Sequence, residues 1–162
     1  MEPTEVKLEG FGAAFSDCRQ YRYALWRIWN PDKGLVMFIG LNPSKANETK
    51  PDPTITRVIG LAAAWGFGGV AMTNLFGVVS PDPNVLIQHP DPVGDCDRWL
   101  PVIAAKCQRV VFAWGAFKQA KHRVDKVIAM FPDAYCLKKT KDGSPWHPLY
   151  IPKSNIPFKF KP

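Results

Sequence analysis

The sequence predicts an α/β fold built on a mostly parallel sheet of four strands, with helices on both faces so that three layers result. Four short apolar runs have the length of strands that are buried on both sides. Segments with helical periodicity separate these runs, and such alternation forms parallel sheets because each helix returns the chain to the same edge. The predicted strands are residues 35–41, 70–75, 109–114 and 134–137.

Turn residues and apolar spacing place the helices between these strands. The first helix runs from Thr54, an N-cap or first-turn residue, to a glycine-rich stretch after about residue 65. Residues 95–107 form the second, in which Pro101 marks a kink or the true start. Residues 116–130 form a third helix with a basic outer face, and residues 84–88 a short one in a proline-rich loop.

An aromatic-rich segment, residues 21–29, predicts a further strand before the parallel ones. Residues 30–34 have turn composition, so we expect residues 21–29 and 35–41 to form an N-terminal antiparallel hairpin that leads into the sheet. After residue 138 the chain is rich in Pro, Lys and Gly, which favours a loop up to its last residue.

The composition fits a single domain over residues 1–162, because 46% of the residues are apolar and can supply a core. No run approaches the ~20 apolar residues of a membrane helix. The acidic N-terminus lacks the apolar stretch of a secretory signal, so we expect a cytoplasmic protein without membrane contact. Four cysteines without CxxC spacing favour reduced, mostly buried thiols over the alternative of an iron–sulfur or zinc site.

The net charge of +7 favours a polyanionic partner, and nucleic acid more than others. The alternative is a solvated basic surface without a partner. The basic side chains gather in the helix of residues 116–130 and in the C-terminal segment. They are Lys118, Lys121, His122, Arg123 and Lys126, followed by Lys138, Lys139, Lys141, Lys153, Lys159 and Lys161.

Ligands of parallel α/β sheets bind beyond the carboxyl ends of the strands, which directs attention to the segments that follow them. These segments are residues 40–44, 73–76, 113–116 and 139–150. Asn42 follows the first strand and is either a water-binding amide or an Asx-turn residue that closes the strand. Asn74 lies in an apolar strand, so its amide is either satisfied by neighbouring backbone or available to read a base edge.

His147 precedes Pro148 in a rigid aromatic loop, from which the ring could donate to a developing anion; the alternative is a surface histidine. Asp52 is either a charge at a helix N-terminus or a general base, and the sequence leaves both open. No phosphate-binding GxxxxGK[ST], dinucleotide-binding GxGxxG or GxSxG motif is present, so no motif predicts a cofactor.

These motifs, in this order, resemble an uncharacterised family, domain of unknown function 1643, which is common in bacteria and their viruses. Its pattern is an aromatic-basic strand, LNPS, DPT, a W-G-(Y/F)-G-G turn, NLF, a W-G pair and T-K-D-G-x-P-x-H-P-L-Y. The resemblance covers nearly the whole chain. The matching segments are residues 23–29, 41–44, 52–54, 65–69, 74–76, 114–115 and 140–150.

The same segments are similar to motifs of the uracil-DNA glycosylase superfamily. Residues 40–44 resemble the G-I-N-P-G water-site motif of its mismatch-specific branch, and Asn74 resembles its base-reading asparagine. Residues 110–116 resemble its V-V-F-x-x-W-G-x-x-A segment, and 147–148 its late H-P-S loop. The resemblance implies a glycosylase-like fold and a substrate-binding set that comprises Gly40, Leu41, Pro43, Ser44, Asn74, Phe76, Trp114, Gly115, Pro148, Leu149 and Tyr150.

Two positions depart from the glycosylase pattern. The late loop lacks the serine after His147-Pro148, so the resemblance does not extend to phosphate contact by that loop. Leu149 or Tyr150 could still fill the gap left by a flipped base. Ser44 stands where uracil-specific enzymes have a tyrosine, so a 5-substituted pyrimidine would find space. Phe76, Trp146 and Trp65 are the candidates for stacking on the base.

The leading hypothesis is a monofunctional DNA glycosylase-like hydrolase that acts on a uracil-related or 5-modified base. In it Asn42 positions water, Asn74 reads the base and His147 stabilises the departing base, with Asp52 as a candidate general base. Two alternatives remain: a non-catalytic DNA or modified-nucleotide binder, and an enzyme that modifies free nucleotides or bases. The oligomeric state has no sequence signal.

Overall fold

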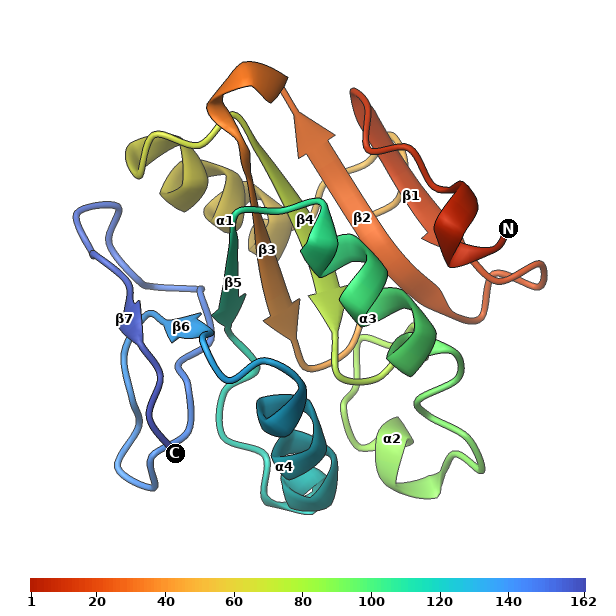
Figure 1. The fold of residues 1–162 in the computed structure, drawn as a ribbon. Coiled ribbons are helices and arrows are strands. Elements are labelled where there is room, and N and C mark those ends of the chain that lie inside the picture. Colours follow the sequence, from red (N-terminus) through yellow and green to blue (C-terminus); the bar gives the residue numbers. More distant parts are fainter.

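The computed structural model describes residues 1–162 and contains a mixed sheet of seven strands with helices on both faces (Figure 1). The strand order across the sheet is β1-β2-β4-β3-β5-β6-β7. The strands are β1 (Phe11–Phe15), β2 (Arg22–Ile28), β3 (Leu35–Gly40), β4 (Gly69–Asn74), β5 (Arg109–Phe112), β6 (Tyr135–Cys136) and β7 (Phe158–Lys159).

The four predicted apolar strands form the parallel centre of this sheet, in the order β4-β3-β5-β6. The prediction of a four-stranded sheet is nevertheless wrong, because antiparallel strands extend the sheet on both sides. β1 consists mainly of glycine, alanine and phenylalanine, and β7 has only two residues. Neither has the apolar alternation that predicts a strand from sequence.

The predicted hairpin between residues 21–29 and 35–41 is also wrong. β2 is antiparallel as expected, but it pairs with β1 and β4, while β3 has β4 and β5 as its neighbours. The turn after β2 passes over the start of β4, where Gly68 accepts from Trp29 and Asn30 and donates to Gly34. A Cβ atom at Gly68 would lie 1.6 Å from the Asn30 carbonyl oxygen, so only glycine permits this crossing.

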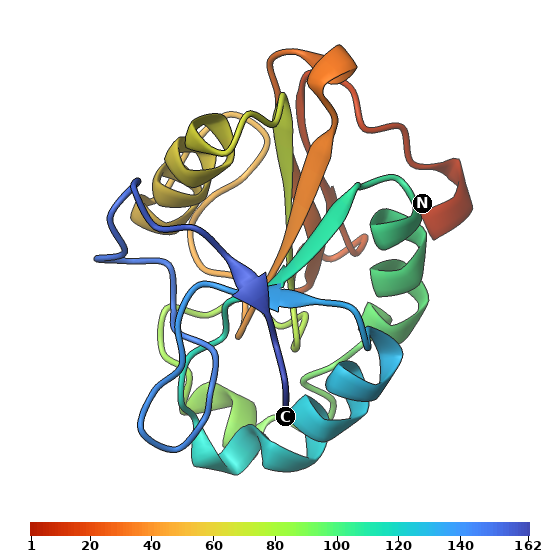
Figure 2. The same ribbon diagram turned by 60° about the vertical axis from the view of Figure 1, so that its left-hand side comes forward.

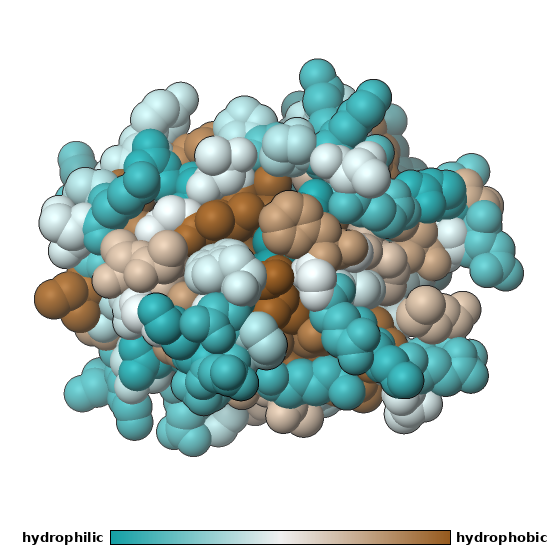
Figure 3. Space-filling model, turned by 90° about the horizontal axis from the view of Figure 1, so that it is seen from above, coloured by the Kyte–Doolittle hydropathy of each residue, from teal (hydrophilic) through white to brown (hydrophobic).

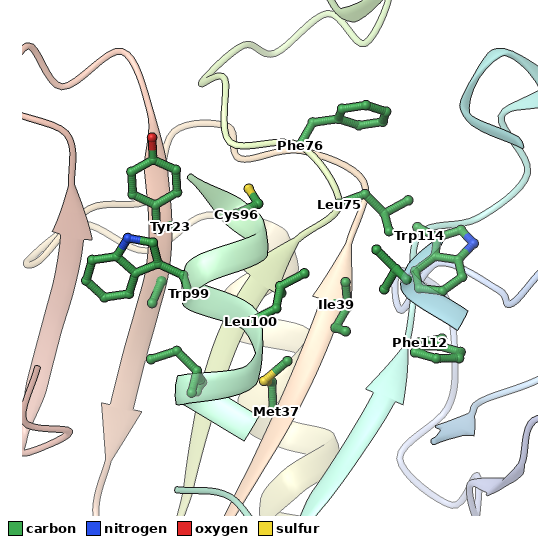
Figure 4. Close-up of a cluster of buried hydrophobic side chains, with 14 of the residues drawn as sticks. Tyr23, Met37, Ile39, Leu75, Phe76, Cys96, Trp99, Leu100, Phe112 and Trp114 are labelled. Atoms are coloured by element: carbon green, nitrogen blue, oxygen red, sulfur yellow. The ribbon is translucent and has the colours of Figure 1, made fainter. Parts of the chain in front are cut away.

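The four helices lie close to their predicted positions, and three of them cover the two faces of the sheet (Figure 2). The helices are α1 (Pro53–Ala64), α2 (Val85–Gln88), α3 (Cys96–Ala105) and α4 (Lys121–Met130), and α3 continues through Pro101. α1 packs on one face over a core that includes Phe38 and Leu61. α3 packs on the other face, where Trp99 and Leu100 meet β-strand side chains (Figure 4), and α4 lies on that side as well.

A β-bulge near the start of β2 changes which side chains face α1. The pairing with β1 passes from Ala24 directly to Arg22, so Tyr23 is the additional residue of the bulge. Tyr23 belongs to the core under α3, whereas the Arg22 side chain reaches the carbonyl oxygen of Ala46 in the core under α1. Simple alternation would place Arg22 on the same side as Ala24, so the bulge redirects it.

Candidate functional site

A cavity of about 260 Å³ lies at the carboxyl ends of β3 and β4, the edge of the sheet that points downward in Figure 1. The opposite end, where these strands begin, presents a mixture of hydrophilic and hydrophobic side chains (Figure 3). Ligands of parallel α/β sheets bind at the carboxyl ends. The cavity is lined by Arg22, Leu25, Gly40, Leu41, Asn42, Ser44, Asp52, Thr54, Ile55, Met72, Asn74, Ser80, Pro81, Pro83, Trp114 and His147.

The cavity brings together eight of the residues that the sequence indicated, although they come from five separate segments of the chain. These residues are Gly40, Leu41, Asn42, Ser44, Asp52, Asn74, Trp114 and His147. The polar members among them are two amides, one hydroxyl, one carboxylate and one imidazole. Such a set, in a small concave space, can orient a small polar ligand by hydrogen bonds from several directions.

The remaining predicted residues lie outside this cavity. Phe76 lines a neighbouring cavity of about 550 Å³ beside α4, and Gly115 lines a third one. Leu149 borders a depression next to Asp52, and Tyr150 is 87% exposed. Pro43 and Pro148 are buried parts of the surrounding loops.

The Asn42 side chain connects two loops and keeps its oxygen free. Its Nδ2 atom lies 2.9 Å from the Ser80 carbonyl oxygen, 3.3 Å from that of Val78 and 3.2 Å from that of Pro43. Because all three neighbours are acceptors, the orientation of the amide is determined. Its Oδ1 atom accepts no hydrogen bond from the chain, so it is available to hold a water or a ligand donor.

Asn74 ends β4 with a buried amide that has no partner. The residue is 4% exposed, and its Nδ2 atom makes no hydrogen bond. A buried amide nitrogen without a partner costs on the order of 1–3 kcal/mol. Thr73, directly before it, satisfies its own hydroxyl by donating to the Phe38 carbonyl oxygen over 2.9 Å, so the deficit is specific to Asn74. The amide nitrogen of Asn74 thus has no acceptor within the protein, and the residue lines the cavity.

His147 presents a neutral ring to the cavity. Its Nδ1 atom accepts a hydrogen bond from the backbone N–H of Leu149 over 3.2 Å, so the proton of the neutral ring resides on Nε2. Burial lowers the pKa of His147, and the charge of Asp52 opposes this only in part. The Nε2–H group is thus a hydrogen-bond donor at neutral pH.

Asp52 is the N-cap of α1 and also closes the loop before it. One carboxylate oxygen accepts from the Ile55 N–H over 2.9 Å, and the other from the Ala46 N–H over 3.3 Å. The helix begins at Pro53, so the cap is Asp52 and Thr54 is a first-turn residue. Both oxygens of Asp52 thus bind backbone, and the carboxylate borders the cavity. Its role as a general base stays a prediction.

Sequence reasoning missed Arg22, which is 3% exposed and lines the cavity. Its Nη1 atom donates to the Ala46 carbonyl oxygen over 2.9 Å, while its Nε atom is buried without a partner. Burial lowers the pKa of Arg22 to about 10, so the group stays charged at neutral pH. An arginine at the start of an aromatic strand was the available signal, but the direction of its side chain depends on the bulge.

The aromatic side chain that lines the cavity is not one of those that the sequence suggested for stacking on a base. Trp65 stacks on Phe38 and donates from Nε1 to the Asn155 carbonyl oxygen, and Trp146 lies under Lys138. Neither lines the cavity, whereas Trp114, 4% exposed, does. Trp114 is therefore the aromatic side chain available to a ligand there.

One member of the basic cluster predicted on residues 116–130, Arg123, does not lie on an exposed face. Arg123 is only 7% exposed, and it donates from Nε to the Leu75 carbonyl oxygen and pairs with Asp97 over 2.6 Å. It therefore stabilises the fold instead of belonging to a solvated face. The other basic residues of this cluster are exposed: Lys118, Lys121, His122 and Lys126.

The chain matches, over residues 22–149, the model of a family described as "Protein of unknown function (DUF1643)". It belongs to this family. The matched range contains every residue that lines the cavity and ends just after His147. No curated protein and no solved structure matches the chain. None of its helices has both the length and the apolar character needed to cross a membrane.

Proposed function

We propose that this cavity binds a uracil-related or 5-modified pyrimidine base and that the protein is a monofunctional, DNA glycosylase-like hydrolase. The observation that carries the proposal is the buried, unpartnered amide nitrogen of Asn74 in a cavity bordered by the free Oδ1 of Asn42 and by His147. A base edge offers acceptors to such a donor. The volume of about 260 Å³ lies just below the usual range for drug-sized ligands, so the cavity would hold no more than a small ligand such as a single base.

The architecture supports this proposal as well. A glycosylase-like fold would have three layers around a central parallel sheet, and β4-β3-β5-β6 with helices on both faces is compatible with it. The motif resemblance adds the order in which Asn42, Asn74, Trp114 and His147 follow one another along the chain. Fold similarity alone does not determine chemistry, so the side chains of the cavity carry the argument.

The proposed reaction is hydrolysis of the N-glycosidic bond. The bond between C1′ and the base nitrogen breaks, and its electron pair leaves with the base. Asn42 Oδ1 accepts from a water whose oxygen forms the new bond to C1′, and the proton released from that water goes to solvent or to the departing base. The Nε2–H of His147 donates to the negative charge that develops on the base. An amide activates water weakly, so we expect slow turnover.

DNA would approach across the exposed basic residues near the cavity. The exposed lysines of residues 118–126 and of the C-terminal segment supply charge for phosphates. Tyr150, 87% exposed on the loop that carries His147, is a candidate for filling the space of a flipped base. A non-catalytic binder would use the same cavity without bond cleavage.

The test uses labelled oligonucleotides that carry uracil, 5-hydroxymethyluracil, thymine mismatches or modified cytosines, followed by alkali to cleave abasic sites. We expect one of them to be cleaved, and Asn42→Ala and His147→Ala each to reduce the rate by about 100-fold. Asn84→Ala is the matched control, because Asn84 is exposed and its side chain caps nothing. Cleavage that is unchanged in Asn42→Ala would contradict the assignment of that residue.

Results without cleavage distinguish the alternatives. Salt-sensitive DNA binding without abasic product would support a non-catalytic binder, because phosphate contacts release counterions. Binding of free nucleotides without preference for DNA would support an enzyme that modifies nucleotides or bases. Either outcome would overturn the glycosylase proposal.

A further inference from the structure

Arg22 places a positive charge at the cavity that forms no ion pair within the protein. The side chain is 3% exposed, and no carboxylate oxygen lies within 4.0 Å of it. The one acidic residue that lines the cavity, Asp52, uses both carboxylate oxygens to accept from backbone N–H groups. A buried charge without a partner costs free energy, so a partner from outside the chain would be bound strongly.

One edge of the Arg22 guanidinium carries N–H groups without a partner in the protein. Nη1 donates to the Ala46 carbonyl oxygen, which fixes the orientation of the group. Nε is buried without a partner, and the one side-chain hydrogen bond of Arg22 is that of Nη1, so Nη2 makes none. Nε–H and Nη2–H point in parallel along one side of a guanidinium and together bind two oxygens of a carboxylate or a phosphate. The bulge at Tyr23 places the side chain on the face of the sheet where the cavity lies, and Arg22 is one of the residues that line it.

Arg22 lines the same cavity as Asn74 and His147, so one ligand could contact all three side chains. The Ala46 carbonyl that Arg22 binds lies two residues after Ser44, which lines the same cavity with a small side chain. A neutral base would satisfy the two amides and the imidazole but would leave the guanidinium unpaired. A base that carries an oxyanion would satisfy all four.

We propose that the ligand of this cavity carries an oxyanion, a carboxylate or a phosphate, which the Nε–Nη2 edge of Arg22 binds through two hydrogen bonds. The inference rests on the proposed function for the base and adds the charged group. The two sources of an oxyanion are the phosphate of a nucleotide and a carboxylate on the pyrimidine ring. Each is compared with its neutral counterpart.

The experiment is calorimetric titration of the purified full chain with four probes: uridine 5′-monophosphate, uridine, 5-carboxyuracil and uracil. We expect one anionic probe to bind at least about tenfold more tightly than its neutral counterpart, since hydrogen bonds between charged groups are worth about that factor or more. A preference for the monophosphate over uridine identifies a phosphate. A preference for 5-carboxyuracil over uracil identifies a carboxylate.

Variants test whether Arg22 causes the preference. Arg22→Met should abolish it, and Arg22→Lys should weaken it, because lysine keeps the charge without the paired donors. Arg98→Met is the matched control, since Arg98 is exposed and pairs with Glu2 and Asp95 on the surface. If Arg22→Met does not fold, the preference of the unmodified protein and of Arg22→Lys still decides the question.

Equal binding of the anionic and neutral probes would overturn the proposal, as would a preference that Arg22→Met retains or the absence of binding by either anionic probe at millimolar concentration. These readouts involve no bond cleavage. A protein that shows the anion preference but cleaves no oligonucleotide would therefore contradict the glycosylase proposal alone. One that cleaves an uncharged base and ignores anions would contradict this inference alone.

Discussion

Two of the three buried arginines, Arg22 and Arg123, differ in the partners of their side chains. Arg123, on α4, is 7% exposed and pairs with Asp97 over 2.6 Å while donating to the Leu75 carbonyl oxygen over 2.8 Å. Arg22, on β2, is 3% exposed and has one backbone carbonyl as its partner. Only a single nitrogen of Arg123, Nη2, lacks a partner, whereas Arg22 has no ion pair at all. The difference indicates that Arg123 stabilises the fold, and it supports the proposal that Arg22 binds a ligand.

The largest change in stability that this comparison predicts follows from removal of the ion pair between Arg123 and Asp97. Asp97→Ala leaves the Arg123 charge buried with no carboxylate, which should lower the free energy of unfolding by about 3 kcal/mol, the low end for a broken buried pair, because Asp97 is partly exposed. Urea denaturation measures this value. Asp125→Ala is the control, since its pair with Lys121 is exposed. A loss below about 1 kcal/mol would remove the contrast between the two arginines.

Asp52→Ala should cost less, about 1–2 kcal/mol, because Asp52 acts as a helix cap and not as the ion-pair partner of Arg22. The same denaturation experiment measures it. Asp52→Asn should recover most of the loss, since asparagine is also a good N-cap. A loss of 3 kcal/mol or more, without recovery in Asp52→Asn, would mean that Asp52 does neutralise Arg22.

His147 predicts a smaller, pH-dependent effect. Burial lowers the pKa of His147 in the folded protein below the ordinary value of 6.5. At pH values between the folded-state pKa and 6.5, the unfolded chain therefore binds more protons than the folded one. The stability contribution is therefore complete above about pH 6.5 and is lost as the pH falls through the folded-state pKa. Unfolding free energies measured at pH 7 and pH 5 should differ less in His147→Gln than in the unmodified protein. An equal difference in both proteins would assign the dependence to other groups.

Arg22→Met should have the smallest effect on stability, within about 1 kcal/mol when no ligand is present. The substitution removes an unpaired buried charge, which is favourable, and one hydrogen bond to the Ala46 carbonyl, which is unfavourable. Thermal unfolding compared with that of Arg98→Met gives the value. Destabilisation as large as that of Asp97→Ala would show that Arg22 is a structural residue like Arg123.

The sequence predicts those strands and helices that a local pattern of apolar residues specifies. β3, β4 and β5 are continuous apolar runs, and the helices between them have clear periodicity, so their positions were predictable. The partner of β2 was not, because β4, from a distant part of the chain, lies between β2 and β3. Two-residue and small-residue strands such as β7 and β1 form only because a neighbouring edge is available.

The residues that line the cavity also differ in whether the local sequence predicts them. That Asn42, Asn74 and His147 would lie close together was predictable, because each stands out from its local sequence at the end of a strand or in a rigid loop; their roles stay predictions. Arg22 was not, because alternation assigns it to the face of Ala24 and only the bulge moves it. That Trp114 lines the cavity, and the residues suggested for stacking do not, likewise depends on how the loops close around it.

The three carbonyl neighbours of Asn42 Nδ2 have a consequence for how this site can change by mutation. In Asn42→Asp, a carboxylate oxygen would take the place of Nδ2 and face the carbonyl oxygens of Pro43, Val78 and Ser80. Oxygen lone pairs would then oppose one another where the amide now donates, and the loops would separate. A change from amide to carboxylate chemistry at this position would therefore require accompanying substitutions in the loop after β4.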